Sequence, residues 1–136
     1  MRTEDLRTPS WTCVHFVDGQ IQGDLANLAE TRTEILTIDV RMVREREDLF
    51  DLLQSAFRFP YFGRNWDALD DVLRDLSWIE ARGFVLIVDG AETLWARLPL
   101  MAGALVESWL LSADYWAARD IPFHLVFQLG NVDGVS

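Results

Sequence analysis

The sequence contains no lysine, so its 12 basic side chains are all arginines, set against 22 acidic ones. The formal net charge is −10 and the isoelectric point is about 4.5. Proteins that bind nucleic acid directly gather lysine and arginine against the phosphates, so this composition argues against that class. A negative surface favours a basic protein partner, whose approach it accelerates. Solubility alone is also a sufficient reason for such a charge.

Cysteine and histidine are scarce. Cys13 is the only cysteine, which excludes an internal disulfide and fits a reducing compartment. The two histidines, His15 and His124, are too few to complete a zinc site with one thiol. Both lie in alternating apolar runs, which is typical of residues in or beside a strand. We therefore expect neither a metal nor another cofactor.

Long hydrophobic runs are also missing. No segment approaches the roughly 20 apolar residues that cross a bilayer, and residues 1–10 are polar and lack the apolar centre of a secretory signal. No glycine-rich phosphate-binding loop is present. We expect a cytoplasmic protein without a membrane partner.

The remaining pattern predicts one α/β domain. Strands are predicted over residues 11–17, 34–40, 84–88 and 123–127, and helices over residues 23–30, 45–57, 65–77 and 100–119. The run at 84–88 is apolar throughout, which indicates a strand buried on both faces of a parallel sheet. Because strands and helices alternate, we expect a small parallel sheet covered by helices. The predicted divisions are an N-terminal extension (1–33), a main domain (34–130) and a tail (131–136).

The most distinctive segment is residues 60–71, an aromatic loop and a glycine turn followed by an acidic helix start. Asp67, Asp71 and Asp75 recur at every fourth residue, which predicts that they line one side of the helix. Like charges at this spacing repel and weaken an isolated helix. The presence of three such acids in one helix therefore needs an explanation.

Helix capping is the first interpretation. Carboxylates in a first turn are stabilised by free N–H groups and by the helix dipole, which accounts for Asp67 and partly for Asp70. Capping does not account for Asp71 and Asp75, which are predicted one and two turns further along the helix. Arg64 and Arg74 could offset part of the repulsion, but exposed ion pairs are weak.

Catalysis and recognition are the other two interpretations. Two carboxylates can divide acid and base roles only in a concave, partly dry site, so a small enzyme predicts a deep pocket around these acids. Recognition instead predicts an acidic ridge that accepts bidentate hydrogen bonds from arginines of a partner. Tyr61 and Phe62 would then pack against that partner and exclude water.

Residues 60–71, PYFGRNWDALDD, resemble the signature of the barstar family, the protein inhibitors of barnase-type ribonucleases. The resemblance extends over about residues 35–129. It implies a three-stranded parallel sheet surrounded by helices, preceded here by a possible extra N-terminal edge strand. It also implies a protein without enzymatic activity, whose loop and acidic helix plug the active site of a basic ribonuclease.

The resemblance implies a role for individual residues. Tyr61 stands where a loop aromatic touches the enzyme, Asp67 where a carboxylate meets active-site cations, and Asp71 where the main anchor replaces the substrate phosphate. The partner-binding residues expected on this basis are Tyr61, Phe62, Gly63, Asn65, Asp67, Asp70, Asp71 and Asp75.

The segment also departs from the family pattern. The loop is one residue shorter, Trp66 replaces a smaller aliphatic residue, and Asp70 replaces an aromatic one. Relatives carry acids late in the last long helix, where the contribution of Asp114 and Asp120 is left open. The partner is therefore expected to be a small ribonuclease or nuclease toxin. The alternative is a regulatory interaction module of the same fold, with a basic partner that is not a nuclease.

Overall fold

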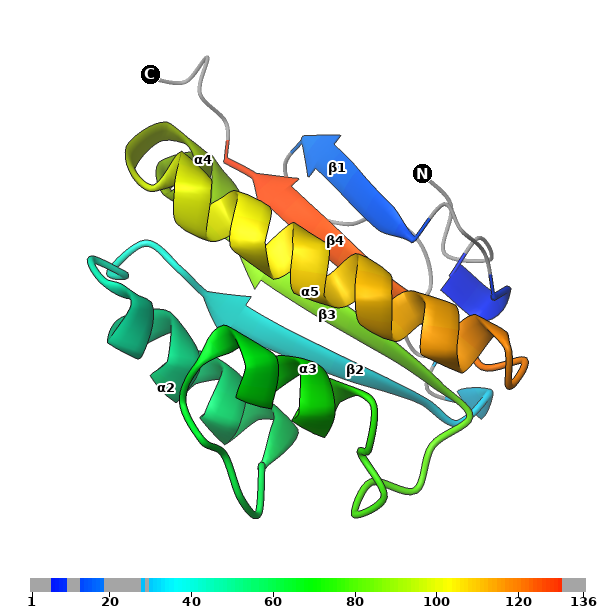
Figure 1. The fold of residues 1–136 in the computed structure, drawn as a ribbon. Helices are drawn as coiled ribbons and strands as arrows, with labels where there is room; N and C mark the ends of the chain where they lie inside the picture. The colour runs from blue at the N-terminus through cyan, green and yellow to red at the C-terminus, as the bar shows by residue number, and fades with distance from the viewer. Residues whose placement is uncertain (1–5, 10–12, 19–27, 29, 131–136) are drawn as a thin grey trace.

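A four-stranded parallel sheet forms the centre of the computed structural model, which describes residues 6–9, 13–18, 28 and 30–130. Its strands are β1 (Val14–Asp18), β2 (Thr33–Asp39), β3 (Gly83–Asp89) and β4 (Phe123–Leu129), in the order β1-β4-β3-β2 (Figure 1). The sheet thus has four strands and not the three that the resemblance implied. The difference is β1, which pairs in parallel with β4 at the edge of the sheet.

Four helices are present among the described residues: α2 (Arg46–Phe57), α3 (Trp66–Leu73), α4 (Ala91–Arg97) and α5 (Pro99–Ala117). Figure 1 shows α2, α3 and α5 lying over the same face of the sheet. The sequence did not predict α4, which follows β3 directly after Gly90. The predicted helix over 23–30 lies outside the described residues except for residues 28 and 30, and the predicted tail over 131–136 lies wholly outside them.

The sheet is buried on both faces, as the apolar run in β3 predicted. The larger core fills the space between the sheet and the helices and includes Phe50, Leu86 and Trp109. A second cluster covers the opposite face, where Val85 of β3 contacts the cluster that contains Leu6. The described part of the N-terminal segment therefore packs on the same domain as the rest of the chain.

Both histidines lie in strands, as their alternating apolar context predicted. His15 Nε2 lies 2.9 Å from His124 Nδ1, and His124 Nε2 lies 2.8 Å from the carbonyl oxygen of Thr8. A carbonyl oxygen can only accept, so in the neutral pair His124 carries its proton on Nε2 and its Nδ1 accepts from His15. The pair joins the edge strand β1 to β4.

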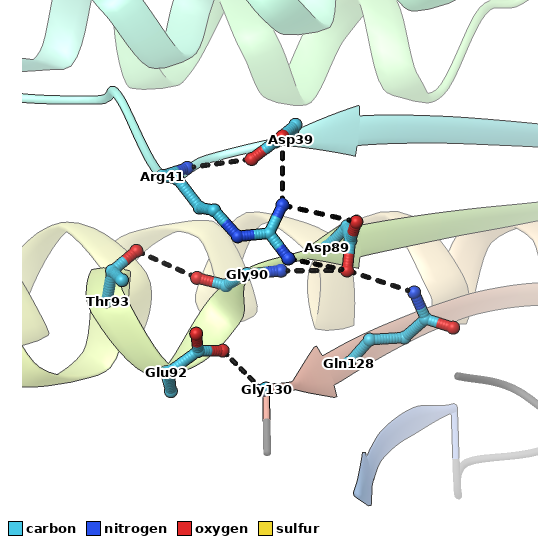
Figure 2. A network of polar contacts seen from close by, with 8 residues as sticks. All are labelled: Asp39, Arg41, Asp89, Gly90, Glu92, Thr93, Gln128 and Gly130. Atoms are coloured by element: carbon cyan, nitrogen blue, oxygen red, sulfur yellow. Dashed lines mark hydrogen bonds and ion pairs between the residues drawn. The ribbon is translucent and has the colours of Figure 1, made fainter. Parts of the chain in front are cut away.

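An arginine network ties the carboxyl ends of three strands together (Figure 2). Arg41 Nη1 lies 2.9 Å from Asp39 Oδ2 and 3.4 Å from Asp89 Oδ2, and Gln128 Nε2 donates to Asp89 Oδ1 at 3.3 Å. Asp89, and then Asp39, raise the pKa of Arg41. Gly90, at φ 72°, is required beside this network, because a Cβ there would lie 2.5 Å from Arg41 Cγ. These charges are thus paired within the chain.

No single helix among the described residues is both long and apolar enough to cross a membrane. Within the same described ranges, α4 and α5 reach that length and apolar content when they are counted together, but a bend of 117° separates the two helices.

Candidate functional site

The loop between α2 and α3 is held down by aromatic packing. The ring of Phe62 meets Phe50 and Phe59 edge-on, with centroids 5.1 and 5.2 Å away. Phe62 is therefore half-buried against the core, whereas Tyr61 leaves 52% of its surface exposed. Of the two loop aromatics, Tyr61 is the one available to a partner.

Arg64 clamps the same loop onto α2. Its guanidinium donates to Asp51 Oδ1 at 2.6 Å, to Gln54 Oε1 at 2.7 Å and to Glu47 Oε1 at 3.1 Å. The hydrogen bond that Arg64 donates to Asp51 is the main reason why the pKa of Arg64 is raised. The expectation that Arg64 offsets the aspartates of α3 is therefore wrong, because Arg64 pairs with acids of the preceding helix, α2.

Asn65 starts α3. Its backbone is extended, at φ −143°, and its Oδ1 accepts the backbone N–H of Ala68 at 2.7 Å, as an N-cap does. Gly63 lets the loop pass close to this first turn, because a Cβ at Gly63 would lie 3.0 Å from the Cβ of Ala68. Gly63 and Asn65 thus shape the loop and fix the direction of the helix.

Replacing Asn65 with alanine is expected to lower the free energy of unfolding by about 1 kcal/mol, because an N–H group at the helix start loses its acceptor. Chemical denaturation of the two proteins measures this change. Asn65→Asp keeps an acceptor at the same place and is the matched control. A loss as large in Asn65→Asp as in Asn65→Ala would contradict the capping role.

The aspartates of this region differ in their surroundings. Asp67 and Asp71 are exposed on α3, and 72% of the Asp71 side chain is open to solvent. Asp71 Oδ1 lies 3.1 Å from Nη2 of Arg74, so Arg74 does offset one of the acids, as expected. Asp70 is half-buried and borders α5 instead of facing outward with the others. The acids therefore form a two-residue exposed pair and not a continuous stripe.

Asp75 lies beyond the helix, which corrects the prediction of a helix to residue 77. α3 ends at Leu73, and the chain turns through Leu76, whose φ is 47°. The turn places the Leu76 side chain in the core, and the hydrogen bond from Trp78 Nε1 to the Phe57 carbonyl, at 2.8 Å, holds the chain that follows. Core packing at these residues outweighs the helical spacing of the sequence.

Asp75 instead accepts a hydrogen bond from the hydroxyl of Tyr61. This bond, followed by hydrogen bonding to Ser77, lowers the pKa of Asp75 below its ordinary value of 3.8. The same bond raises the pKa of the Tyr61 hydroxyl above 10.0. The contact thus joins the loop to the end of α3 and orients the exposed ring of Tyr61.

Tyr61→Phe is expected to raise the pKa of Asp75 toward its ordinary value. A depressed carboxyl pKa stabilises the folded state above the unfolded-state pKa, and that stability is lost as the pH falls through the folded-state pKa. Wild type should therefore lose more stability than Tyr61→Phe between about pH 6 and about pH 2. Carboxyl-detected NMR titration of Asp75 and urea denaturation at both pH values measure the two effects. An unchanged pKa of Asp75 in the variant would contradict the assignment.

The end of α5 lies beside the end of α3, because Trp116 Nε1 donates to the Leu73 carbonyl at 2.7 Å. Arg119 stacks over Tyr115, with its guanidinium carbon 3.5 Å from the ring centroid. Asp114 is exposed on α5, and Asp120 follows the helix in a turn at φ 61°. Whether either acid contributes to binding stays a prediction.

A cleft of about 200 Å³ opens between α3 and α5. It is lined by Trp66, Asp67, Asp70, Ala104, Glu107, Ser108 and Leu111. The α5 residues were not among those predicted from the sequence, although Glu107, a charge within the apolar part of the helix before Asp114, could have indicated them. Within the described residues, no group of three histidine, cysteine, aspartate or glutamate side chains is placed to hold a metal ion.

Comparison with known proteins shows the family and the fold of this chain. Residues 33–128 match the family described as Barstar (barnase inhibitor). No curated protein matches the sequence. Among solved structures, the chain is similar to the Aeropyrum pernix ORC2 protein in its ADPNP–ADP complexes, with a TM-score of 0.60 and 12% sequence identity.

The ORC2 match covers 90% of this chain but 36% of the ORC2 chain, so this chain spans about a third of that protein. At this level of identity the likeness shows a common fold alone. The family match is different in kind, because it covers most of the chain and includes the whole of the loop and α3. On that basis, this chain belongs to the barstar family.

Proposed function

We propose that this protein inhibits a basic ribonuclease, or a nuclease toxin of similar charge, by covering the active site with α3 and the loop before it. The observation that carries the proposal is the pair Asp67 and Asp71, exposed one turn apart on α3. The N-cap at Asn65 and the clamp at Arg64 fix this helix before any partner arrives. A rigid binding element loses little conformational entropy on association.

The pair has the chemistry to imitate a nucleic-acid backbone. Ribonuclease active sites bind phosphate through cationic side chains, and carboxylates accept charge-assisted hydrogen bonds from the same groups. In the proposal Asp71 takes the place of the substrate phosphate and Asp67 binds a neighbouring cation. The ring of Tyr61, held by Asp75, packs beside them. Phe62, Gly63 and Asn65 contribute by shaping the loop.

The proposed role requires neither catalysis nor a cofactor from this chain. We place it in the cytoplasm, where a protein with one buried thiol and no disulfide suits the reducing conditions. Binding should depend on long-range attraction, because the net charge of −10 accelerates encounter with a cationic surface.

Cleavage of RNA by a barnase-type ribonuclease, titrated with this protein, tests the proposal. We expect activity to fall to zero at one equivalent of inhibitor, and association to slow as salt rises, because ions screen the attraction. Full activity at a large excess of this protein would reject that enzyme as the partner. Capture of basic proteins from the native cell would then test the alternative, since recovery of a partner without nuclease activity would favour a regulatory module.

A further inference from the structure

An unsatisfied carboxylate oxygen borders the cleft between α3 and α5. Asp70 lines this cleft, and its Oδ1 is shielded from solvent without a hydrogen-bond partner in the described part of the chain. A buried polar atom without a partner costs free energy, and a charged one costs more. In the free protein this oxygen lacks a hydrogen bond, and a donor that enters the cleft would supply one.

Other groups around the cleft accept donors as well. The carboxylates of Asp67 and Glu107 line it from opposite helices. Ser108 lines it too, and only 4% of this residue is exposed. The cleft thus combines three carboxylates with a buried hydroxyl.

The two arginines next to α3 in the sequence are engaged elsewhere. Arg64 is bound to α2, and Arg74 is bound to Asp71. Among the described residues, no ion pair links an arginine to Asp67, Asp70 or Glu107. The charge of the cleft is consequently left for a cation from outside the chain.

The shape of the cleft selects among cations. Its carboxylates are not gathered around one point, since no group of three such side chains can hold a metal ion within the described residues. A volume of about 200 Å³ is several times the roughly 30 Å³ of one water molecule. Trp66 and Leu111 add apolar walls. A guanidinium is planar, weakly hydrated and carries five spread donors, whereas an ammonium is compact and strongly hydrated.

We propose that the cleft receives one arginine side chain of the partner, with Asp70 as its inner acceptor. The inference rests on the proposed function, because it assigns a second anchor to the same interface beside the pair Asp67 and Asp71. It gives a role to two departures from the family pattern, Asp70 and Trp66, and to Glu107. The partner is therefore expected to present an arginine, not a lysine, next to its active site.

Methylguanidinium, titrated into the full chain and followed by ¹H–¹⁵N NMR, tests the cleft without any protein partner. We expect saturable shifts at the Trp66 indole N–H and at the backbone amides of Ala104 and Ser108. Methylammonium at equal ionic strength should shift the same signals several-fold less. Absence of saturable shifts there, or equal shifts with both cations, would overturn the proposal.

Asp70→Asn removes the charge of the inner acceptor at constant shape and should weaken methylguanidinium binding about tenfold or more. Glu107→Gln should weaken it less, because Glu107 is exposed. The matched control is Asp18→Asn, an exposed acid on β1, which should leave the dissociation constant unchanged. Equal dissociation constants for Asp70→Asn and wild type would refute the role of Asp70.

The experiments distinguish a failure of the cleft proposal from a failure of the proposed inhibition of a ribonuclease. Methylguanidinium binding that depends on Asp70, in a protein that inhibits no ribonuclease, would support the cleft and reject the proposed function. Inhibition that is unchanged in Asp70→Asn, together with no methylguanidinium binding, would support the function and reject the cleft.

Discussion

Asp71→Ala is expected to weaken binding to the cognate ribonuclease by about 30-fold to a few thousand-fold. Truncating one member of a desolvated, hydrogen-bonded charge pair at an interface costs about 2–5 kcal/mol, a range to which the barnase–barstar pair itself contributes. The pairing of Asp71 with Arg74 is no obstacle, since a solvent-exposed pair at 3.1 Å contributes little. Isothermal titration or stopped-flow association measures the change.

A change of charge alone must be separated from the loss of the anchor. Asp18→Ala removes the same charge from the opposite edge of the sheet, on β1, and should alter the association rate only slightly. The stability of Asp71→Ala should stay within about 0.5 kcal/mol of wild type, as for most exposed substitutions. Equal affinities of Asp71→Ala and Asp18→Ala would remove Asp71 from the account.

Trp109→Ala is expected to be the most destabilising single substitution in α5, at about 3–5 kcal/mol. Trp109 is fully buried, stacks on Phe123 with ring centroids 4.0 Å apart, and donates from Nε1 to the Phe123 carbonyl at 3.1 Å. The variant loses the buried ring, leaves a cavity between α5 and β4, and removes one hydrogen bond to that carbonyl. Typical domains have only about 5–15 kcal/mol of total stability, so this loss is a large share.

Denaturation by urea, followed by far-ultraviolet circular dichroism, measures this loss. Trp109→Phe keeps most of the ring but not the N–H, and should cost about 1–3 kcal/mol. Trp95→Phe is the matched control, because the Nε1 of Trp95 is buried without a hydrogen-bond partner in the described residues. Removing that donor should be close to neutral. A larger loss in Trp95→Phe than in Trp109→Phe would contradict the role given to the Phe123 bond.

Much of the fold follows from local sequence signals. The uniformly apolar β3 predicted a strand buried on both faces, and the core between helices and sheet agrees with that prediction. Pro99 at the start of α5 and the extended N-cap at Asn65 mark helix starts that are visible in the sequence. These signals depend only on neighbouring residues, which explains why they could be recognised.

The errors arose where distant contacts decide the structure. α3 ends four residues before the predicted position, because Leu76 turns into the core and Trp78 bonds to the Phe57 carbonyl. α4 is only seven residues long and follows a glycine with positive φ, so it carried no clear helical pattern.

The candidate site also contains residues that one short motif predicts and residues whose positions depend on distant contacts. The loop and the exposed acids Asp67 and Asp71 could be predicted, because they lie in one short motif. Helical spacing alone could not separate Asp70 from them, since its half-buried position depends on α5 lying alongside. The clamp from Arg64 to Asp51 and the bond from Tyr61 to Asp75 join residues more than ten positions apart. Such pairings are set by the folded arrangement of α2, the loop and α3.

The central claim is that the face of α3 with Asp67 and Asp71 occupies the phosphate site of a ribonuclease. Titration of this protein into the cognate ribonuclease, with and without a mononucleotide phosphate bound in the enzyme's active site, tests it most directly. The nucleotide and this protein would then compete for one site. The account predicts that the apparent dissociation constant of this protein rises linearly with the concentration of free nucleotide, with a slope set by the nucleotide's own dissociation constant. An apparent dissociation constant that is independent of nucleotide concentration would show binding elsewhere on the enzyme and would contradict the account.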